Sequence, residues 1–263
     1  MTERPLVAFT LLAQMAVGAF LTLGALDLWA GGLAGDPAAH ALTNGVLLAI
    51  GPVMALSLLA SLFHLGAPLA AWRAVRNVRS SWLSREVLLA SSFTAAGAVF
   101  AVLRWSGAGS PSLRTRIAFL AGACGLAMVY AMARVYRLRT VPAWDSALTT
   151  ISFFATTVLL GSLAVGTGLA VFPGVPETLV TPPLHVIAVA AAGAFGAELA
   201  QRGKGTLHGV RRGLLLAGLA MCVLLLLTGG RATWLVAGAF ASALAAQGIG
   251  RLLFYDTGLR RAL

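Results

Sequence analysis

A histidine and a carboxylate lie close together in this sequence, where one long apolar segment ends and the next begins. His64 ends the first segment within His-Leu-Gly-Ala-Pro (64–68), and Glu86 begins the second. Ionisable groups at membrane depth are costly, so their presence there indicates function. A neutral histidine can accept a hydrogen bond from a quinol hydroxyl, and a carboxylate can accept its proton. The pair therefore predicts proton transfer beside an apolar pocket, as quinol oxidation requires.

The same two residues also have simpler interpretations. His64 can be an interfacial residue that bonds to a backbone carbonyl, and Glu86 can cap a helix start, where the helix dipole favours a carboxylate. Ser84 would then be the N-cap. Trp72 and Trp82 flank this region, where tryptophans usually act as interfacial anchors.

Other redox and metal chemistry finds little support in the sequence. Of the four histidines, His40 and His185 are expected on the membrane face opposite His64, which leaves no ligand pair for a b-type haem. Two cysteines cannot hold an iron–sulfur cluster, and no His, Cys, Asp or Glu residues have metal-ligand spacing. We therefore expect no haem, iron–sulfur cluster or metal site in this chain.

The elements that must position His64 and Glu86 are membrane-spanning helices. The chain is 59% hydrophobic and only 10% charged, which predicts an all-α, polytopic membrane protein with a single domain over residues 1–263. Glycines such as Gly161 and Gly166 are expected to allow close helix packing. The sequence predicts eight spans, at Leu6–Trp29, Leu42–Leu65, Val87–Leu103, Ile117–Ala133, Leu148–Phe172, Pro183–Leu199, Gly213–Gly230 and Thr233–Leu253.

Basic residues are distributed unevenly around these eight spans. The net charge is +11, and most of the 19 basic residues fall on the side that holds both termini and the segment between His64 and Glu86. Arg104, Arg114, Arg116 and Arg231 fall on the other side. Membrane proteins keep basic loops inside, so this pattern predicts cytoplasmic termini and disfavours nucleic-acid binding as the reason for the charge.

At these residues the sequence resembles the membrane-anchor subunit of dimethyl sulfoxide reductase, the DmsC family. The resemblance begins with Pro5-Leu6, Phe9-Thr10 and Gln14, and continues through the segment at 64–68 and Leu83-Ser84-Arg85-Glu86. Arg134-Val135-Tyr136 and Thr140-Val141-Pro142, followed by Trp144 and Ser146, resemble the middle of the family, and Gly250-Arg251 with Phe254-Tyr255 resemble its last helix. Two positions depart from the family pattern, with Ala70 where Arg is frequent and Gln247 where Glu is common.

The resemblance implies a multi-pass subunit of a bacterial or archaeal plasma membrane, without a redox centre of its own. Such a subunit anchors a molybdopterin catalytic subunit and a four-cluster iron–sulfur subunit, oxidises menaquinol and passes the electrons to the iron–sulfur partner. The enzymatic role would be quinol oxidation within an oxidoreductase complex.

The expected site follows from the same resemblance and from the residues themselves. His64 and Glu86 are the predicted catalytic pair, and Gly66 belongs to the same segment. Arg73 and Arg85 are expected to tune the carboxylate and to stabilise negative charge on the half-oxidised quinone. The remaining predicted quinone-site residues are Tyr136 and Trp144, with Tyr255 as an alternative contact.

Two other functions remain open on the sequence. A transporter would require repeats or broken helices with a site at the membrane midplane, and the chain shows neither. A purely structural anchor would have no quinone site, and mutation at His64 would then leave the assembled complex unaffected.

Overall fold

The computed structural model describes residues 4–29, 37–62, 77–138, 140–141, 144–172, 177–200, 205–230 and 232–262. These residues form eight helices, each with a segment long and apolar enough to cross a membrane, which confirms the predicted eight-span, all-α architecture. The helices are α1 (Arg4–Trp29), α2 (Pro37–Leu62), α3 (Trp82–Trp105), α4 (Pro111–Tyr136), α5 (Ala147–Val171), α6 (Glu177–Leu199), α7 (Thr206–Leu227) and α8 (Trp234–Ala262).

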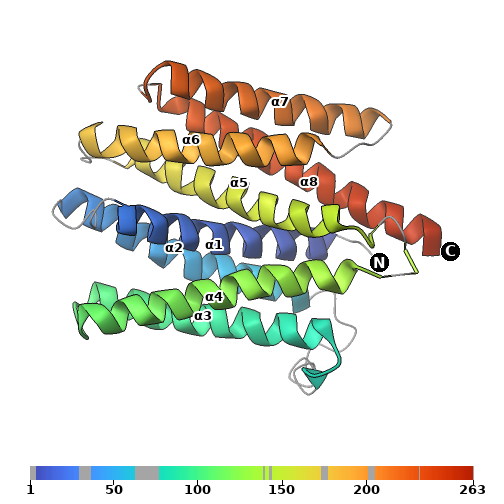
Figure 1. The fold of residues 1–263 in the computed structure, drawn as a ribbon, viewed down its shortest axis with the longest axis horizontal. Coiled ribbons are helices and arrows are strands. Elements are labelled where there is room, and N and C mark those ends of the chain that lie inside the picture. The colour runs from blue at the N-terminus through green and yellow to red at the C-terminus, as the bar shows by residue number, and fades with distance from the viewer. Residues whose placement is uncertain are drawn as a thin grey trace.

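The helices form one elongated bundle in which chain neighbours lie side by side. Figure 1 shows α3 and α4 along one edge, α7 and α8 along the other, and α1 and α5 between them. The N- and C-termini lie at the same end, as an even number of spans requires. We call this end the basic end, because Arg85, Arg134, Arg137 and Arg212 lie at or near the helix ends that meet there.

Serine caps fix where three of the helices begin. The Ser81 side chain accepts a hydrogen bond from the backbone N–H of Ser84, so α3 begins at Trp82. Ser110 and Ser146 cap α4 and α5 in the same way. The predicted N-cap at Ser84 is therefore wrong, and so is the interpretation of Glu86 as a helix cap, because Glu86 lies in the second turn and no acidic residue occupies the first.

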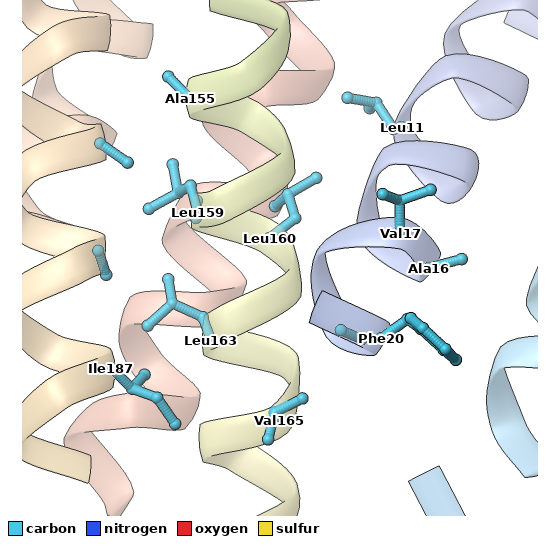
Figure 2. Close-up of a cluster of buried hydrophobic side chains, with 14 of the residues drawn as sticks. Leu11, Ala16, Val17, Phe20, Ala155, Leu159, Leu160, Leu163, Val165 and Ile187 are labelled. Atoms are coloured by element: carbon cyan, nitrogen blue, oxygen red, sulfur yellow. The ribbon is translucent and has the colours of Figure 1, made fainter. Parts of the chain in front are cut away.

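Helices α1 and α5 cross with their backbones in contact at the centre of the bundle. A Cβ atom added to Gly18 would lie 1.9 Å from the Thr157 carbonyl oxygen, and one added to Gly161 would lie 2.1 Å from the Gly18 carbonyl carbon. The backbones can approach this closely because both positions are glycine, which confirms the close packing expected at Gly161. Figure 2 shows the apolar side chains around the crossing, including Val17 and Leu160.

Aromatic contacts join the α3–α4 edge to this centre. The Phe20 ring on α1 meets Phe93 and Phe100 of α3 edge to face, with ring centroids 5.7 and 5.8 Å apart. Gly125 of α4 lies against Val17 and Phe93, leaving room for both side chains. The face of α3 that carries Phe93 is therefore the face that packs into the bundle.

Candidate functional site

Glu86 is buried inside the bundle near the basic end. It shares one face of α3 with Ala90 and Phe93, at the i, i+4 and i+7 spacing of a single helix face. Only 4% of Glu86 is exposed, compared with 1% for each of the other two. The Ser81 cap fixes the start of α3, and the packing of α3 against the bundle turns this face inward. The structure thus places an acid within a membrane span and behind the lipid-facing surface, where a charge is costly.

Three predicted site residues, His64, Gly66 and Arg73, lie outside the residues that the structure describes. The segment that holds them connects α2, which ends at Leu62, to Asn77, four residues before the Ser81 cap. The predicted pairing of His64 with Glu86 therefore remains a prediction.

Arg85 bonds to the connection that precedes α3. Its guanidinium donates to the carbonyl oxygens of Val78 and Arg79, both at 2.8 Å, and its Cζ lies 4.2 Å from the centre of the Trp82 ring. Arg134 of α4 lies over the same ring at 5.0 Å. Trp82 thus contacts two cations at the membrane boundary, and Arg85 holds in place the connection that leads into α3.

Aromatic side chains from α4, from the connection between α4 and α5, and from α8 gather at the basic end. The Tyr136 ring meets Trp144 at 5.8 Å and Tyr255 at 5.4 Å between centroids, and Trp144 stacks on Phe254 at 5.0 Å. The Trp144 indole N–H donates to the Phe254 carbonyl oxygen over 2.9 Å. Tyr136 and Trp144, which are eight positions apart, therefore meet Tyr255 from the last helix in one cluster.

The two tyrosine hydroxyls of this cluster bond to each other. The Tyr255 hydroxyl donates to the Tyr136 hydroxyl over 3.1 Å, in the interior of the protein. Glu86 and Arg251 both lie near enough to interact electrostatically with these hydroxyls. The aromatic cluster and the buried acid consequently belong to one region, which lies between α3, α4 and α8.

The sequence analysis did not predict a second set of buried polar residues. Arg251 of α8 donates to the Gln14 side-chain oxygen over 3.0 Å, and its guanidinium lies 3.6 Å from the centre of the Phe153 ring. One turn earlier on α8, the Gln247 oxygen accepts a hydrogen bond from Thr156 of α5 over 3.1 Å. These contacts fix α8 to α1 and α5 at the depth of the candidate site.

A buried ion pair links α6 to α7 near the basic end of the bundle. Arg211 pairs with Glu198, and Glu198 also accepts a hydrogen bond from Ser152 of α5 over 2.8 Å. Glu198 is fully buried and only 7% of Arg211 is exposed. Both Glu198 and Arg251 fall inside predicted spans, so the criterion that singled out Glu86, an ionisable residue in an apolar run, would have found them too.

Replacing Glu198 with alanine is expected to destabilise the bundle strongly, because Arg211 would keep a buried charge without its partner. Removing one partner of a buried pair costs about 3–5 kcal/mol. The thermal midpoint of the purified membrane complex measures the effect. The control is Asp145→Ala at the exposed Arg137–Asp145 pair, 3.3 Å apart, where about 0–1 kcal/mol is expected. Equal midpoints for the two variants would contradict the prediction.

Metal ligands are scarce in the part of the chain that the structure describes. No group of three or more His, Cys, Asp or Glu side chains is close enough to hold a metal ion among those residues. Cys124 on α4 and Cys222 on α7 are free thiols on separate helices. Among the described residues, Glu86 and the tyrosine pair can form hydrogen bonds and exchange protons beside aromatic and apolar surfaces.

Comparison with known proteins gives a family match that covers the first six helices. The family described as DMSO reductase anchor subunit (DmsC) matches residues 1–203, which include α1 to α6. The resemblance at Gly250-Arg251 and Phe254-Tyr255 lies beyond that match. No solved structure gives a significant match.

Individual relatives support the same assignment. The protein is 34% identical to the C chain of anaerobic dimethyl sulfoxide reductase from Escherichia coli over 207 residues, which cover 75% of this protein and 70% of that one. It is 31% identical to YnfH, an anaerobic dimethyl sulfoxide reductase protein of the same organism, covering 72% of its own length and 64% of the relative. The C subunit of sulfite dehydrogenase from Allochromatium vinosum is 35% identical over 40% of this protein and 37% of the relative's length.

Eight membrane-crossing helices, a buried acid at the basic end and a family match over most of the length lead to one assignment. This chain is a multi-pass membrane protein that belongs to the DMSO reductase anchor subunit family.

Proposed function

We propose that this protein anchors a molybdoenzyme complex in the membrane and oxidises menaquinol for it. The observation that carries the proposal is the carboxylate of Glu86, buried inside a membrane span in a member of an anchor-subunit family. The partners would be a molybdopterin catalytic subunit and a four-cluster iron–sulfur subunit. They would dock at the basic end, where Arg79 and Arg212 are exposed.

Quinol oxidation releases two protons and two electrons, and the proposed site assigns each to an acceptor. His64 hydrogen-bonds one quinol hydroxyl and takes its proton, and Glu86 takes the proton of the other or relays it toward the aqueous boundary. The electrons leave to the nearest iron–sulfur cluster of the partner. The apolar interior around Phe93 excludes bulk water, which keeps the transferred protons on the side chains of this protein.

In this proposal the aromatic cluster orients the quinol ring. Tyr136 and Trp144 are held by the Trp144–Phe254 hydrogen bond and by the hydroxyl pair with Tyr255. Rigid side chains of this kind can fix the plane of a quinol ring at low entropic cost. Gly66 and Arg73 would complete the site from the segment before α3.

The opposite direction, reduction of a quinone, is a second candidate function. It is favoured by the match to a protein named as part of a sulfite dehydrogenase, because a dehydrogenase delivers electrons where a reductase consumes them. The same residues would then donate protons. Steady-state assays of the purified complex with a quinol analogue and with a quinone analogue separate the two directions.

Replacing His64 with alanine is expected to weaken quinol binding by about 10- to 100-fold, the effect of losing one hydrogen bond in a desolvated site. The measurement is titration of a fluorescent quinol analogue into membranes that contain the assembled complex. His208→Ala is the matched control, because His208 lies on α7 near the same end and is half-buried. Unchanged binding by His64→Ala would move the quinol toward Tyr136 and Trp144 and leave His64 with a structural role.

A further inference from the structure

Arg251 carries a buried positive charge beside the aromatic cluster of the basic end. It lies in the membrane span of α8, and only 4% of it is exposed. Among the described residues, its guanidinium donates to the neutral side-chain oxygen of Gln14 and lies over the Phe153 ring, and its Nε atom has no hydrogen-bond partner. A charge held by neutral groups in the interior acts strongly on its surroundings, because little water screens it.

Two other buried charged residues lie within electrostatic reach of Arg251. These are Glu198 and Arg211, which form an ion pair with each other. Glu198 also accepts a hydrogen bond from Ser152. Because the opposite charges of the pair largely cancel at a distance, Arg251 is left to act mainly on the neutral groups around it.

The tyrosine hydroxyls lie within the electric field of Arg251. Tyr255 is one turn further along the same face of α8, and both hydroxyls interact electrostatically with Arg251. The Phe153 ring of α5 lies 3.6 Å from the Arg251 guanidinium, measured to its centre, and 5.9 Å from the Tyr136 ring between centroids. A cation beside a hydroxyl stabilises negative charge on the oxygen, so it strengthens the hydrogen bond that the hydroxyl donates.

The direction of the hydrogen bond between the tyrosines makes Tyr136 the outer donor. Tyr255 is only 2% exposed and donates to the Tyr136 hydroxyl, so Tyr136 keeps its own proton for another acceptor. Tyr136 is partly exposed, and Glu86 interacts electrostatically with both hydroxyls. A hydrogen-bond donor and a proton acceptor therefore lie near each other, as the removal of a proton from a substrate hydroxyl requires.

We propose that the Tyr136 hydroxyl donates a hydrogen bond to the quinol oxygen whose proton moves to Glu86, and that Tyr255 and Arg251 polarise this donor. As the quinol O–H bond breaks, the proton passes to the Glu86 carboxylate and the electron pair of the bond stays on the quinol oxygen. Tyr136 stabilises this negative charge until the electrons leave to the iron–sulfur partner. Tyr136 is then a catalytic residue, and Arg251 and Tyr255 are positioning residues. These roles rest on the proposed oxidation of quinol and deepen it.

The test measures quinol-driven turnover of the assembled complex. Tyr136→Phe keeps the ring that contacts Trp144 and removes only the hydroxyl, and we expect kcat to fall about 100-fold, as for the loss of one donor to a developing oxyanion. Tyr130→Phe is the matched control, because Tyr130 lies on the same helix against Trp82 and should retain wild-type turnover. A reduced dye that donates directly to the partner subunits should support equal activity in every variant, which shows that the complex is assembled.

A double-mutant cycle tests whether Arg251 acts through Tyr136. Arg251→Gln removes the charge, and we expect it to lower kcat about tenfold in the wild-type background but at most about twofold in the Tyr136→Phe background. Tyr255→Phe should show the same dependence on the background. Arg251→Lys keeps the charge and should remain within about threefold of wild type.

Three results would overturn the proposal. Wild-type turnover by Tyr136→Phe, with Glu86→Gln still slow, would remove the tyrosine hydroxyls from the chemistry and leave the proposed function of Glu86 intact. The same fold-loss from Arg251→Gln in both backgrounds would make Arg251 a structural residue. Wild-type turnover by both Tyr136→Phe and Glu86→Gln would contradict the proposed function of Glu86 as well.

Discussion

Replacing Glu86 with glutamine is expected to lower quinol-driven turnover of the assembled complex about 100-fold. Glutamine has nearly the same volume and can still form hydrogen bonds, so the bundle should fold, but it cannot accept a proton. Loss of a positioned general base typically costs about 10²- to 10⁴-fold in rate. Because the substitution removes proton transfer rather than contact area, kcat should fall while KM for the quinol analogue changes little.

The assay for this prediction needs two controls. A reduced dye that donates electrons directly to the partner subunits should support the same activity in Glu86→Gln as in wild type, which shows that the complex is assembled. Ser91→Ala changes an exposed residue one turn and a half further along α3 and should leave quinol-driven turnover unchanged. Turnover of Glu86→Gln within threefold of wild type would remove this carboxylate from the proposed mechanism.

Substitution of Gly18 by alanine is expected to cause a large loss of stability. The new methyl group would lie 1.9 Å from the Thr157 carbonyl oxygen, and backbone atoms cannot rotate away as a side chain can. Helices α1 and α5 would have to separate at the centre of the bundle, where they also contact α2, α6 and α8. Overpacking in a core usually costs about 1–3 kcal/mol, and we expect the upper end of this range or more.

The effect can be read from the thermal midpoint of the purified complex and from the amount of protein that accumulates in membranes. Gly24→Ala is the control on the same helix, because its Cβ would meet nothing within 4 Å and the residue is exposed. Alanine is a better helix former than glycine, so this control should be neutral or slightly stabilising. Similar midpoints for Gly18→Ala and Gly24→Ala would show that α1 and α5 do not cross as closely as described.

The sequence predicted which helices exist better than it predicted where they begin and end. Long apolar runs predicted all eight spans, because a helix is the way a single apolar segment satisfies its backbone in lipid. The start of α3 was predicted at Val87 and lies at Trp82. The residues just before Val87 include polar ones, so the hydropathy pattern does not reveal the first turn of α3. The start of that turn is set by the hydrogen bond from the Ser84 N–H to the Ser81 hydroxyl.

The same limit applies to the candidate site. Glu86, Tyr136 and Trp144 were singled out by residue type and by family resemblance, and the structure places Tyr136 against Trp144. Arg251 and Gln14 were not paired, because they are 237 positions apart in the chain and nothing in either segment specifies the other. Only the packing of α8 against α1 in the tertiary structure shows that these two residues form a pair.

The sequence alone therefore determined that this protein is a membrane protein, how many times it crosses the membrane, and that Glu86 is an acid beside an apolar span. These properties follow from composition and from local hydropathy, which act within a single segment. Only the tertiary structure decided which way Glu86 faces, that Tyr136 and Tyr255 share a hydrogen bond, and that Glu198 neutralises Arg211. Those properties depend on the angles and register at which helices pack, and packing in lipid is set by close contacts such as Gly18 against Gly161 rather than by hydrophobicity.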